Sequence, residues 1–359
     1  MDVYLQEVVA GRSNVIASIG GAREGKDLMF NGHIDTVPPF GMNAPFDAEV
    51  RDGKLFGRGS TDMKSGVGAM VYSLIILKRL GIQLKGKLVF AGVIDEDAAG
   101  SAGTRYVVEH GPRTDLAIVG EPTKLFPVIA HKGCDYFEET FHGKSVHSSV
   151  PENGSNAIFA AADFIERIEN TLIPEYNAKH HDLVGSPTIN AGLIQGGAHS
   201  NIPFLLGETP TFSATIPDLC KVYLDVRWTP DQTIQEVTDD IKKIIDEVKA
   251  NRSDISADIQ YYKDMARPAM EISDKNKLVK SVQKHISKIL NESKLPKGET
   301  FWADSGLLYD TAGIPTLIFG PGDIKRAHSD NEFINISDLV PAVKTYIKTA
   351  LDICGYRTH

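Results

Sequence analysis

The sequence lacks the features that mark membrane, secreted or nucleic-acid-binding proteins. Its 359 residues include no apolar stretch of about 18 residues, the length that a membrane span needs, and no signal-peptide pattern at the N-terminus. The net charge is −9, from 38 basic and 47 acidic residues, and no basic run stands out. This balance argues against nucleic acid and anionic membranes as partners.

Cysteine is scarce as well. The three cysteines, Cys134, Cys220 and Cys354, are far apart and odd in number, and none forms a Cys-x-x-Cys pair. Such residues are typical of free thiols in a reducing compartment, so we expect a cytoplasmic protein. Hydrophobic residues make up 42% of the chain, which is enough for the cores of two domains of ordinary size.

The two ends of the chain share a pattern of alternating strands and helices. Lys87–Ile94 and Leu116–Val119 are nearly continuous apolar runs, as in strands that are buried on both faces. Met63–Leu80 has a helical apolar face, and the pattern resumes with a strand at Pro315–Phe319 and a closing helix at Ser337–Ile353. These segments predict an α/β domain with a mostly parallel sheet.

The middle of the chain follows a different pattern. Thr188–Ile194 and Val222–Trp228 alternate apolar and polar residues, as half-exposed antiparallel strands do. With amphipathic helices at Ala157–Leu172 and Ile234–Val248, the order becomes β-α-β-β-α-β, which is ferredoxin-like. We therefore predict that residues 131–266 form an α+β domain inserted into an α/β domain of residues 1–130 and 267–359. Two crossings of this kind favour hinge motion.

The first candidate metal-binding pair is His33 and Asp35, just past the predicted strand Asp27–Phe30. A polar His-x-Asp pair at a strand end does not suit a hydrophobic core. In a metal site, the carboxylate would hold one ring nitrogen and leave the other for the metal. This pair alone is weak evidence for a metal site. Four further motifs, which also lie next to predicted strands or turns, support that interpretation.

Each of the further motifs has a simpler explanation when it is taken alone. Asp62, flanked by glycines, could cap a helix, and His328 could be a hydrogen-bonded surface residue. Glu96 and Asp97 could belong to a solvated loop, but adjacent acids after a buried strand repel each other strongly unless a cation lies there. Because all of these motifs lie near strand ends of one predicted sheet, where such sheets bind ligands, we expect them to form one site.

The donor set contains two imidazoles, three carboxylates and no thiolate. It suits Zn²⁺, Co²⁺ or Mn²⁺ better than Ca²⁺ or a structural zinc site. It also exceeds what one catalytic zinc needs, so we predict two divalent ions, most consistent with Zn²⁺, that share one carboxylate. The predicted ligands are His33, Asp62, Asp97, Glu121 and His328.

These motifs resemble those of the M20 family of metallopeptidases and amidohydrolases, which includes acetylornithine deacetylase, succinyl-diaminopimelate desuccinylase and aminoacylase. The resemblance covers nearly the whole chain, in order and at matching spacing. It rests on Asn31-Gly32-His33-Ile34-Asp35-Thr36-Val37-Pro38, Gly57-Arg58-Gly59-Ser60-Thr61-Asp62-Met63-Lys64-Ser65-Gly66, Gly120-Glu121-Pro122-Thr123, and Gly320-Pro321-Gly322 followed by Ala327-His328 and Asn331-Glu332.

The resemblance implies a role for each ligand. His33 and Glu121 would hold one ion, Asp97 and His328 would hold the other, and Asp62 would bridge the two. One departure affects this set, because the family's acidic pair is usually Glu-Glu. The shorter aspartate at position 97 would hold its ion differently or more weakly.

The resemblance also implies roles outside the ligand set. Asp35 would orient the first imidazole ligand, and Glu96 would act as the general base. Residues 131–266 would be a lid and dimerisation domain, whose His147 reaches the partner subunit's active site and binds the oxyanion. Asn201 and Arg227 would contact the substrate, with the guanidinium pairing with its α-carboxylate.

The expected activity is hydrolysis of the amide bond of an N-acyl amino acid by a metal-dependent homodimer. An alternative within the family is a peptidase that acts on di- or tripeptides. A non-catalytic ligand-binding protein is disfavoured by the intact ligand set, and a metal-dependent phosphoesterase by the lack of clustered Lys or Arg near the ligands. The chain begins close to the first motif, without the leading helix of most members, so we expect either an internal start or a missing helix.

Overall fold

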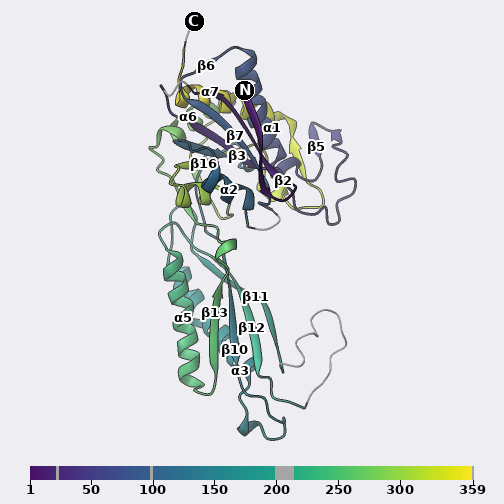
Figure 1. The fold of residues 1–359 in the computed structure, drawn as a ribbon, viewed down its shortest axis with the longest axis vertical. Coiled ribbons are helices and arrows are strands. Elements are labelled where there is room, and N and C mark those ends of the chain that lie inside the picture. Colours follow the sequence, from purple (N-terminus) through teal and green to yellow (C-terminus); the bar gives the residue numbers. More distant parts are fainter. Residues whose placement is uncertain (22–23, 98–99, 199–213, 358–359) are drawn as a thin grey trace. The chain divides into compact units, whose positions relative to one another are not determined.

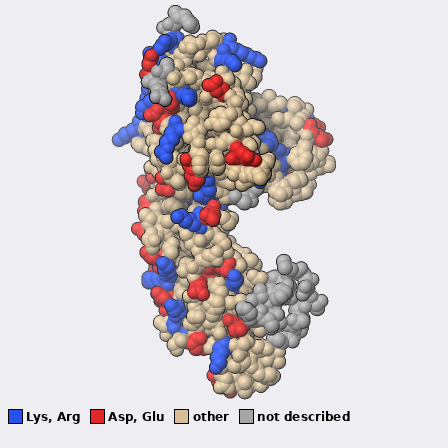
Figure 2. All heavy atoms as spheres, in the orientation of Figure 1, with Lys and Arg blue, Asp and Glu red and all other residues tan. Residues whose placement is uncertain are grey.

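The computed structural model describes residues 1–21, 24–97, 100–198 and 214–357 (Figure 1). Contacts divide the chain into two compact units, Met1–His131 with Arg267–His359, and Lys132–Ala266. Acidic and basic side chains are interspersed on the face drawn in Figure 2. Among the described residues, no helix combines the length and the apolar character that crossing a membrane requires.

A mixed sheet forms the centre of the first unit. Its order is β1-β2-β7-β3-β8-β16-β9-β14, and β15 also pairs with β9. Strands β7, β3, β8 and β16 run parallel to one another, whereas β1, β2 and β14 pair antiparallel with their neighbours. The predicted α/β architecture is confirmed, with the parallel strands at the centre of the sheet. The strands are β1 (Asp2–Val9), β2 (Arg12–Gly20), β3 (Leu28–His33), β7 (Lys87–Val93), β8 (Leu116–Val119), β9 (Val128–His131), β14 (Met270–Glu271), β15 (Lys297–Glu299) and β16 (Thr316–Ile318).

Helices cover this sheet and leave the carboxyl ends of its central strands at one edge. All six residues of β3 are buried, as expected for a central strand with layers on both faces. Helices α1 (Ser65–Arg79) and α7 (Leu339–Cys354) pack against each other and against β3 and β7. Helix α2 (Ala102–His110) contacts β7, and α6 (Lys277–Leu290) packs on α7. Because β3, β7 and β8 are parallel, the residues that follow them meet at the same edge.

Two small sheets complete the first unit. One has the order β17-β5-β4, formed by Phe333–Asn335, Lys54–Phe56 and Val50–Arg51, and the other pairs β18 (Tyr356–Arg357) with β6 (Gln83–Leu84). The pairing of β17 with β5 joins two segments that are far apart in the sequence. Short 3₁₀ or π turns occur at η1 (Ser60–Lys64), η6 (Leu307–Thr311), η7 (Ile324–Arg326) and η8 (Ile336–Asp338).

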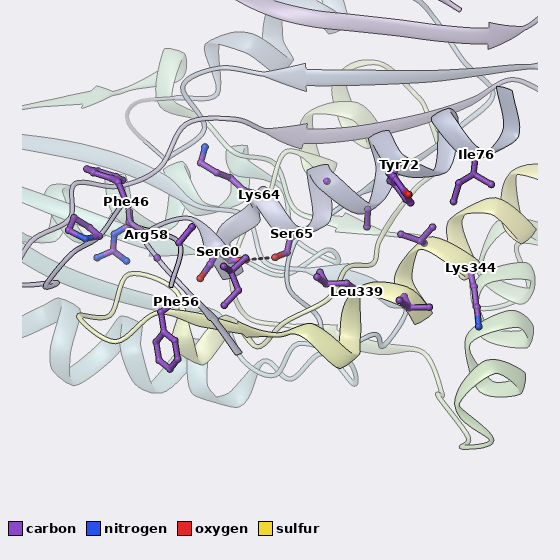
Figure 3. A pocket seen from close by; sticks show the side chains of 18 of the residues that line it. Phe46, Phe56, Arg58, Ser60, Lys64, Ser65, Tyr72, Ile76, Leu339 and Lys344 are labelled. Atoms are coloured by element: carbon purple, nitrogen blue, oxygen red, sulfur yellow. Dashed lines mark hydrogen bonds between the residues drawn. The ribbon is translucent and has the colours of Figure 1, made fainter. Parts of the chain in front are cut away.

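A groove of about 740 Å³ lies between the loop before β4 and helices α1 and α7 (Figure 3). Its lining is mostly apolar and includes Phe46, Tyr72 and Leu339. Ser60 and Ser65 also line it, and the Ser65 hydroxyl donates a hydrogen bond to the Ser60 carbonyl. The turn that precedes α1 therefore borders this groove.

The second unit has a four-stranded antiparallel sheet in the order β11-β12-β10-β13. The strands are β10 (Asp135–His142), β11 (Thr188–Gly197), β12 (Leu219–Arg227) and β13 (Ser256–Tyr261). Helices α3 (Ala157–Arg167) and α5 (Ile234–Asn251) contact each other and the sheet (Figure 1), and η2 (Pro151–Asn153), η3 (Ile168–Leu172), α4 (Ile173–Ala178) and η5 (Lys263–Met265) complete the unit. The ferredoxin-like order predicted for this part of the chain is confirmed.

Glu139 is a buried carboxyl group in the core of the second unit. It alternates along β10 with Phe141, whose ring lies 5.4 Å from that of Phe164 in α3, and its neighbours across the sheet are Val222 and Ile259. Neither carboxyl oxygen has a hydrogen-bond partner among the described residues. Burial raises the pKa of Glu139 to about 8, so this side chain is neutral in the folded protein at neutral pH.

We expect Glu139→Gln to stabilise the protein at alkaline pH. Because the folded pKa of about 8 lies above the unfolded value, the wild type is stabilised at low pH and loses this stability as the pH rises through the folded pKa. The free energy of unfolding of the variant, relative to the wild type, should rise by a few kcal/mol between about pH 4 and about pH 9. Denaturant titration of the full chain measures it.

Glu138→Gln is the matched control. The bonds that Glu138 accepts from Lys221 and Tyr262 outweigh its burial and lower its pKa. Its charge therefore stabilises the folded state above the unfolded pKa, and its loss should destabilise the protein near neutral pH. A wild type and a Glu139→Gln variant with the same pH dependence would contradict the assignment of a neutral Glu139.

Candidate metal centre

His33 ends β3 with a fully buried ring. Its Nε2 lies 3.1 Å from Oδ1 of Asp62 and 3.6 Å from Oε1 of Glu121. Its Nδ1 lies 3.2 Å from the backbone carbonyl of Asp35 and 3.6 Å from the carboxylate of that residue. Asp35 thus contacts one ring nitrogen, and the other faces two acids, which is the arrangement of an oriented metal ligand. Burial disfavours the imidazolium, but Asp35 and Asp62 outweigh it and raise the pKa of His33.

Asp62 lies in the turn η1 and presents one oxygen to each of two imidazoles. Oδ1 faces His33, and Oδ2 lies 3.2 Å from Nε2 of His328. The alternative that Asp62 caps a helix is wrong, because α1 begins at Ser65 with Lys64 at its N-cap position and has no side-chain cap. Burial of the carboxyl opposes ionisation, but the two imidazoles outweigh it and hold the pKa of Asp62 well below its usual range.

Asp97 and His328 face each other beside Asp62. Oδ1 of Asp97 lies 3.2 Å from Nε2 of His328, and Oδ2 accepts a hydrogen bond from the amide of Val37 at 3.0 Å. The shorter acid therefore still lies beside His328 and Asp62. His328 is 51% exposed in its side chain, and its bonds to Asp62 and Asp97 raise its pKa to about 10.

The five predicted ligands form two groups of donors that share Asp62. In each group the donor atoms lie within 4.8 Å of one another, and a third combination with His33, Glu96 and Asp97 meets the same limit. Oε1 of Glu121 is buried without a hydrogen-bond partner among the described residues, and it faces the imidazole of His33. A buried carboxylate oxygen of this kind is costly unless a cation compensates it, so the donor set fits two divalent ions. The two groups are His33, Asp62 and Glu121, and Asp62, Asp97 and His328.

Glu96 lies beside these groups and is buried. Its burial, with the nearby charges of Asp304, Asp62 and Asp97, raises its pKa well above the ordinary value. The backbone around it is fixed, because the carboxylate of Asp35 accepts hydrogen bonds from the amides of Glu96 at 3.3 Å and of Asp97 at 3.1 Å. A buried carboxylate held in this way is suited to take up and return a proton.

Three buried charged residues near the site had no predicted role. Glu332 accepts hydrogen bonds from the turn that carries Asp62, and Arg58 pairs with Glu332 at 2.6 Å. Asp304 accepts a hydrogen bond from Thr104 at 2.6 Å. The signal for Arg58 and Glu332 is in the sequence, since both stand inside the motifs quoted above, but an isolated Asp304 carries none.

The structure describes two of the three site residues that were predicted in the second unit. His147 is exposed in the segment after β10, and its Nδ1 lies 2.7 Å from the hydroxyl of Ser149. Arg227, at the end of β12, makes a bidentate pair with Asp225 through Nε at 2.8 Å and Nη2 at 3.0 Å. Asn201 lies outside the described residues.

Two curated relatives resemble the chain over nearly its whole length. Acetylornithine deacetylase from Myxococcus xanthus is 28% identical over 364 residues, which cover 99% of this chain and 87% of that protein. N-formyl-4-amino-5-aminomethyl-2-methylpyrimidine deformylase from Halalkalibacterium halodurans is 29% identical over 388 residues, which cover 99% of this chain and 86% of that protein.

Two solved structures share the fold. Aminopeptidase PepT from Bacillus cereus superposes with a TM-score of 0.76 at 18% identity, covering 98% of this chain and 88% of that one. The YXEP protein from Bacillus subtilis is described as a dinuclear metal-binding peptidase of the M20 family. It has a TM-score of 0.68 at 16% identity, and the match covers 98% of this chain and 88% of that one. At these identities the likeness confirms the fold alone.

The model of peptidase family M20/M25/M40 matches residues 29–352. This range includes both groups of candidate ligands as well as the second unit. The predicted resemblance is therefore confirmed, and the family and the donor set together support a centre of two divalent metals. The chain belongs to peptidase family M20/M25/M40 and is a metal-dependent amidohydrolase.

Proposed function

We propose that this protein hydrolyses the amide bond of an N-acyl amino acid at a centre of two zinc ions. His33, Glu121 and Asp62 would hold one ion, and Asp62, Asp97 and His328 the other, with Co²⁺ or Mn²⁺ as less favoured metals. The observation that carries the proposal is the placement of Asp62, which turns one oxygen to each of two imidazoles beside the buried Glu96. When bound, such ions activate water and polarise a carbonyl group.

The protein's own groups would do the rest of the chemistry. Glu96 takes a proton from the attacking water and returns it to the leaving amine. Asp35 fixes this base through the amide of Glu96, and its own carbonyl holds the ring of His33. These contacts keep the reacting groups in place before substrate binds, which lowers the cost of reaching the transition state.

The second unit would supply the substrate contacts. In this proposal it acts as the lid and dimerisation domain, and its His147 stabilises the oxyanion in the partner subunit's active site. Asn201 contacts the substrate, and Arg227 exchanges Asp225 for the substrate's α-carboxylate. The guanidinium group of Arg227 supports this role, because it already binds the carboxylate of Asp225 through two hydrogen bonds, as it would bind a substrate carboxylate.

The names of the two curated relatives support an acylated amine as the substrate, since one is a deacetylase and the other a deformylase. Amine release from N-acetylornithine, N-succinyl-diaminopimelate, N-acetylmethionine and a dipeptide tests this proposal. We expect release from an N-acyl amino acid, loss of activity with a chelator and recovery with Zn²⁺ or Co²⁺. Release from the dipeptide alone would favour the alternative, a di- or tripeptide metallopeptidase. No release from any of the four by metal-loaded protein would contradict the proposal.

We also propose a homodimer formed through the second unit. Strand β11 is an edge of its sheet, and among the described strands it pairs only with β12. Leu193 and Ile194 on this strand are 50% and 46% exposed, and Phe159 on α3 is 61% exposed. Apolar side chains along a free edge favour pairing with a second copy. Light scattering that gives the mass of one chain at micromolar concentration would contradict this.

The cytoplasm remains the proposed compartment. All three cysteines, Cys134, Cys220 and Cys354, are buried and are not joined in disulfides in the structure, as expected in a reducing environment. Fractionation of the source cells, with the protein followed by antibody, tests the assignment. Recovery of the protein outside the cytoplasmic fraction would contradict it.

A further inference from the structure

Glu332 is a fully buried carboxylate that accepts four hydrogen bonds from one turn. Oε1 accepts from the amides of Thr61 at 2.9 Å and Asp62 at 3.1 Å. Oε2 accepts from the amide of Gly59 at 3.1 Å and from Nη1 of Arg58 at 2.6 Å. Hydrogen bonds to an ionised acceptor are the strong ones, so this side chain sets the backbone path of the turn that presents Asp62.

Arg58 extends the same network to two further segments. Its guanidinium donates to the carbonyl of Ser329 at 3.2 Å, and to the carbonyls of Pro38 at 3.2 Å and Pro39 at 3.3 Å. The side chains of Arg58 and Glu332 are each 1% exposed. Ser329 follows His328 directly, so the ion pair touches both the turn of one candidate ligand and the loop of another.

We propose that the Glu332–Arg58 pair is a positioning device for the ion held by Asp62, Asp97 and His328. This inference rests on the proposed ligand roles. The pair contacts the segments of Asp62 and His328 directly, and β17 pairs with β5 to join these segments further. His33 ends β3 and Glu121 follows β8 in the central sheet, so among the ligands of the other ion only Asp62 lies on the turn that the pair holds.

The chemistry of the network explains why a carboxylate stands at position 332. Each of its oxygens is surrounded only by donors, two amides on one side and an amide and a guanidinium on the other. A glutamine of the same size would turn its NH₂ group toward two donors in either orientation. Glu332→Gln therefore keeps the volume of the side chain and breaks the turn's hydrogen bonds.

Calorimetric titration of the metal-free protein with Co²⁺, followed also by visible absorption, tests the proposal. The wild type should show two binding events, and His328→Ala identifies the event that belongs to the Asp62–Asp97–His328 group. In Glu332→Gln that same event should weaken by about 10–100-fold, the loss typical of an outer partner of a metal ligand, and the other event, which the pair affects only through Asp62, should weaken less. Arg58→Lys keeps the positive charge but loses the planar guanidinium group with its several N–H donors. It should weaken the same event less.

Asp352→Asn is the control for a merely structural loss. Asp352 in α7 accepts hydrogen bonds from His285 and Ser281, and its removal should lower the melting temperature without changing either binding event. Equal weakening of both events in Glu332→Gln, or no weakening of either, would overturn the positioning role. Circular dichroism establishes folding, and Arg58→Lys decides the question if Glu332→Gln does not fold. A wild type that binds no Co²⁺ would refute the proposed function itself.

Discussion

Glu96→Ala should abolish amide hydrolysis and leave both metal ions bound. The two donor groups that share Asp62 do not include Glu96, so metal content should stay at the wild-type level. The loss of a general base typically reduces kcat by about 10²–10⁴-fold, and here the same carboxylate also returns the proton to the leaving amine. Metal analysis and amine-release kinetics on the same preparation measure both parts of the prediction.

This experiment also separates two interpretations of the buried acids. Glu96 with His33 and Asp97 forms a third combination of donors, so a role as ligand predicts a loss of bound metal in Glu96→Ala. Asp95→Asn is the matched control, because Asp95 is the neighbouring acid but pairs with Arg12. It should retain turnover close to the wild type. Turnover that survives in Glu96→Ala would remove Glu96 from the role of base.

Asp62→Ala should have the largest effect on metal binding of any single substitution. Its two oxygens face His33 and His328, so both donor groups lose a member at once. Both ions should bind more weakly, by more than the 10–100-fold that the loss of an outer partner costs, and hydrolysis should fall below detection. Metal content after dialysis against a weak chelator gives the readout.

Glu121→Ala provides the comparison for this prediction. Glu121 belongs to one donor group only, so its removal should weaken the ion near His33 and spare the other. Asp62→Asn serves as a milder variant, since it keeps the size of the side chain and removes its charge. A protein with Asp62→Ala that keeps one tightly bound ion would show that Asp62 does not bridge the two sites.

The centre of the fold was predictable from local patterns. Strands β7 and β8 are continuous apolar runs because both of their faces are covered, and this pattern is visible in the sequence without a partner. The candidate ligands were predictable for the same reason, since residues after parallel strands meet at one edge. His33 ends β3 and Glu121 follows β8, and these two strands are neighbours in the sheet.

Features that depend on distant pairing were not predictable. Strands β1 and β2 form an antiparallel hairpin at the sheet's edge, and β1 is exposed on both faces, so it lacks a buried stripe to reveal it. The bond from the amide of Asp62 to Glu332 spans 270 positions. Nothing local to Glu332 shows that its oxygens will meet four donors of a single turn, because that environment exists only after the chain folds.

The order of strands in the central sheet has a consequence for synthesis on the ribosome. Strand β16 lies between β8 and β9, yet it is made after the whole of the second unit. The sheet therefore stays open at β8 and β9 until residue 318 has left the ribosome, whereas the second unit is complete at residue 266. We expect the second unit to fold first during translation, with the exposed strands of the first unit left to chaperones until their last partners emerge.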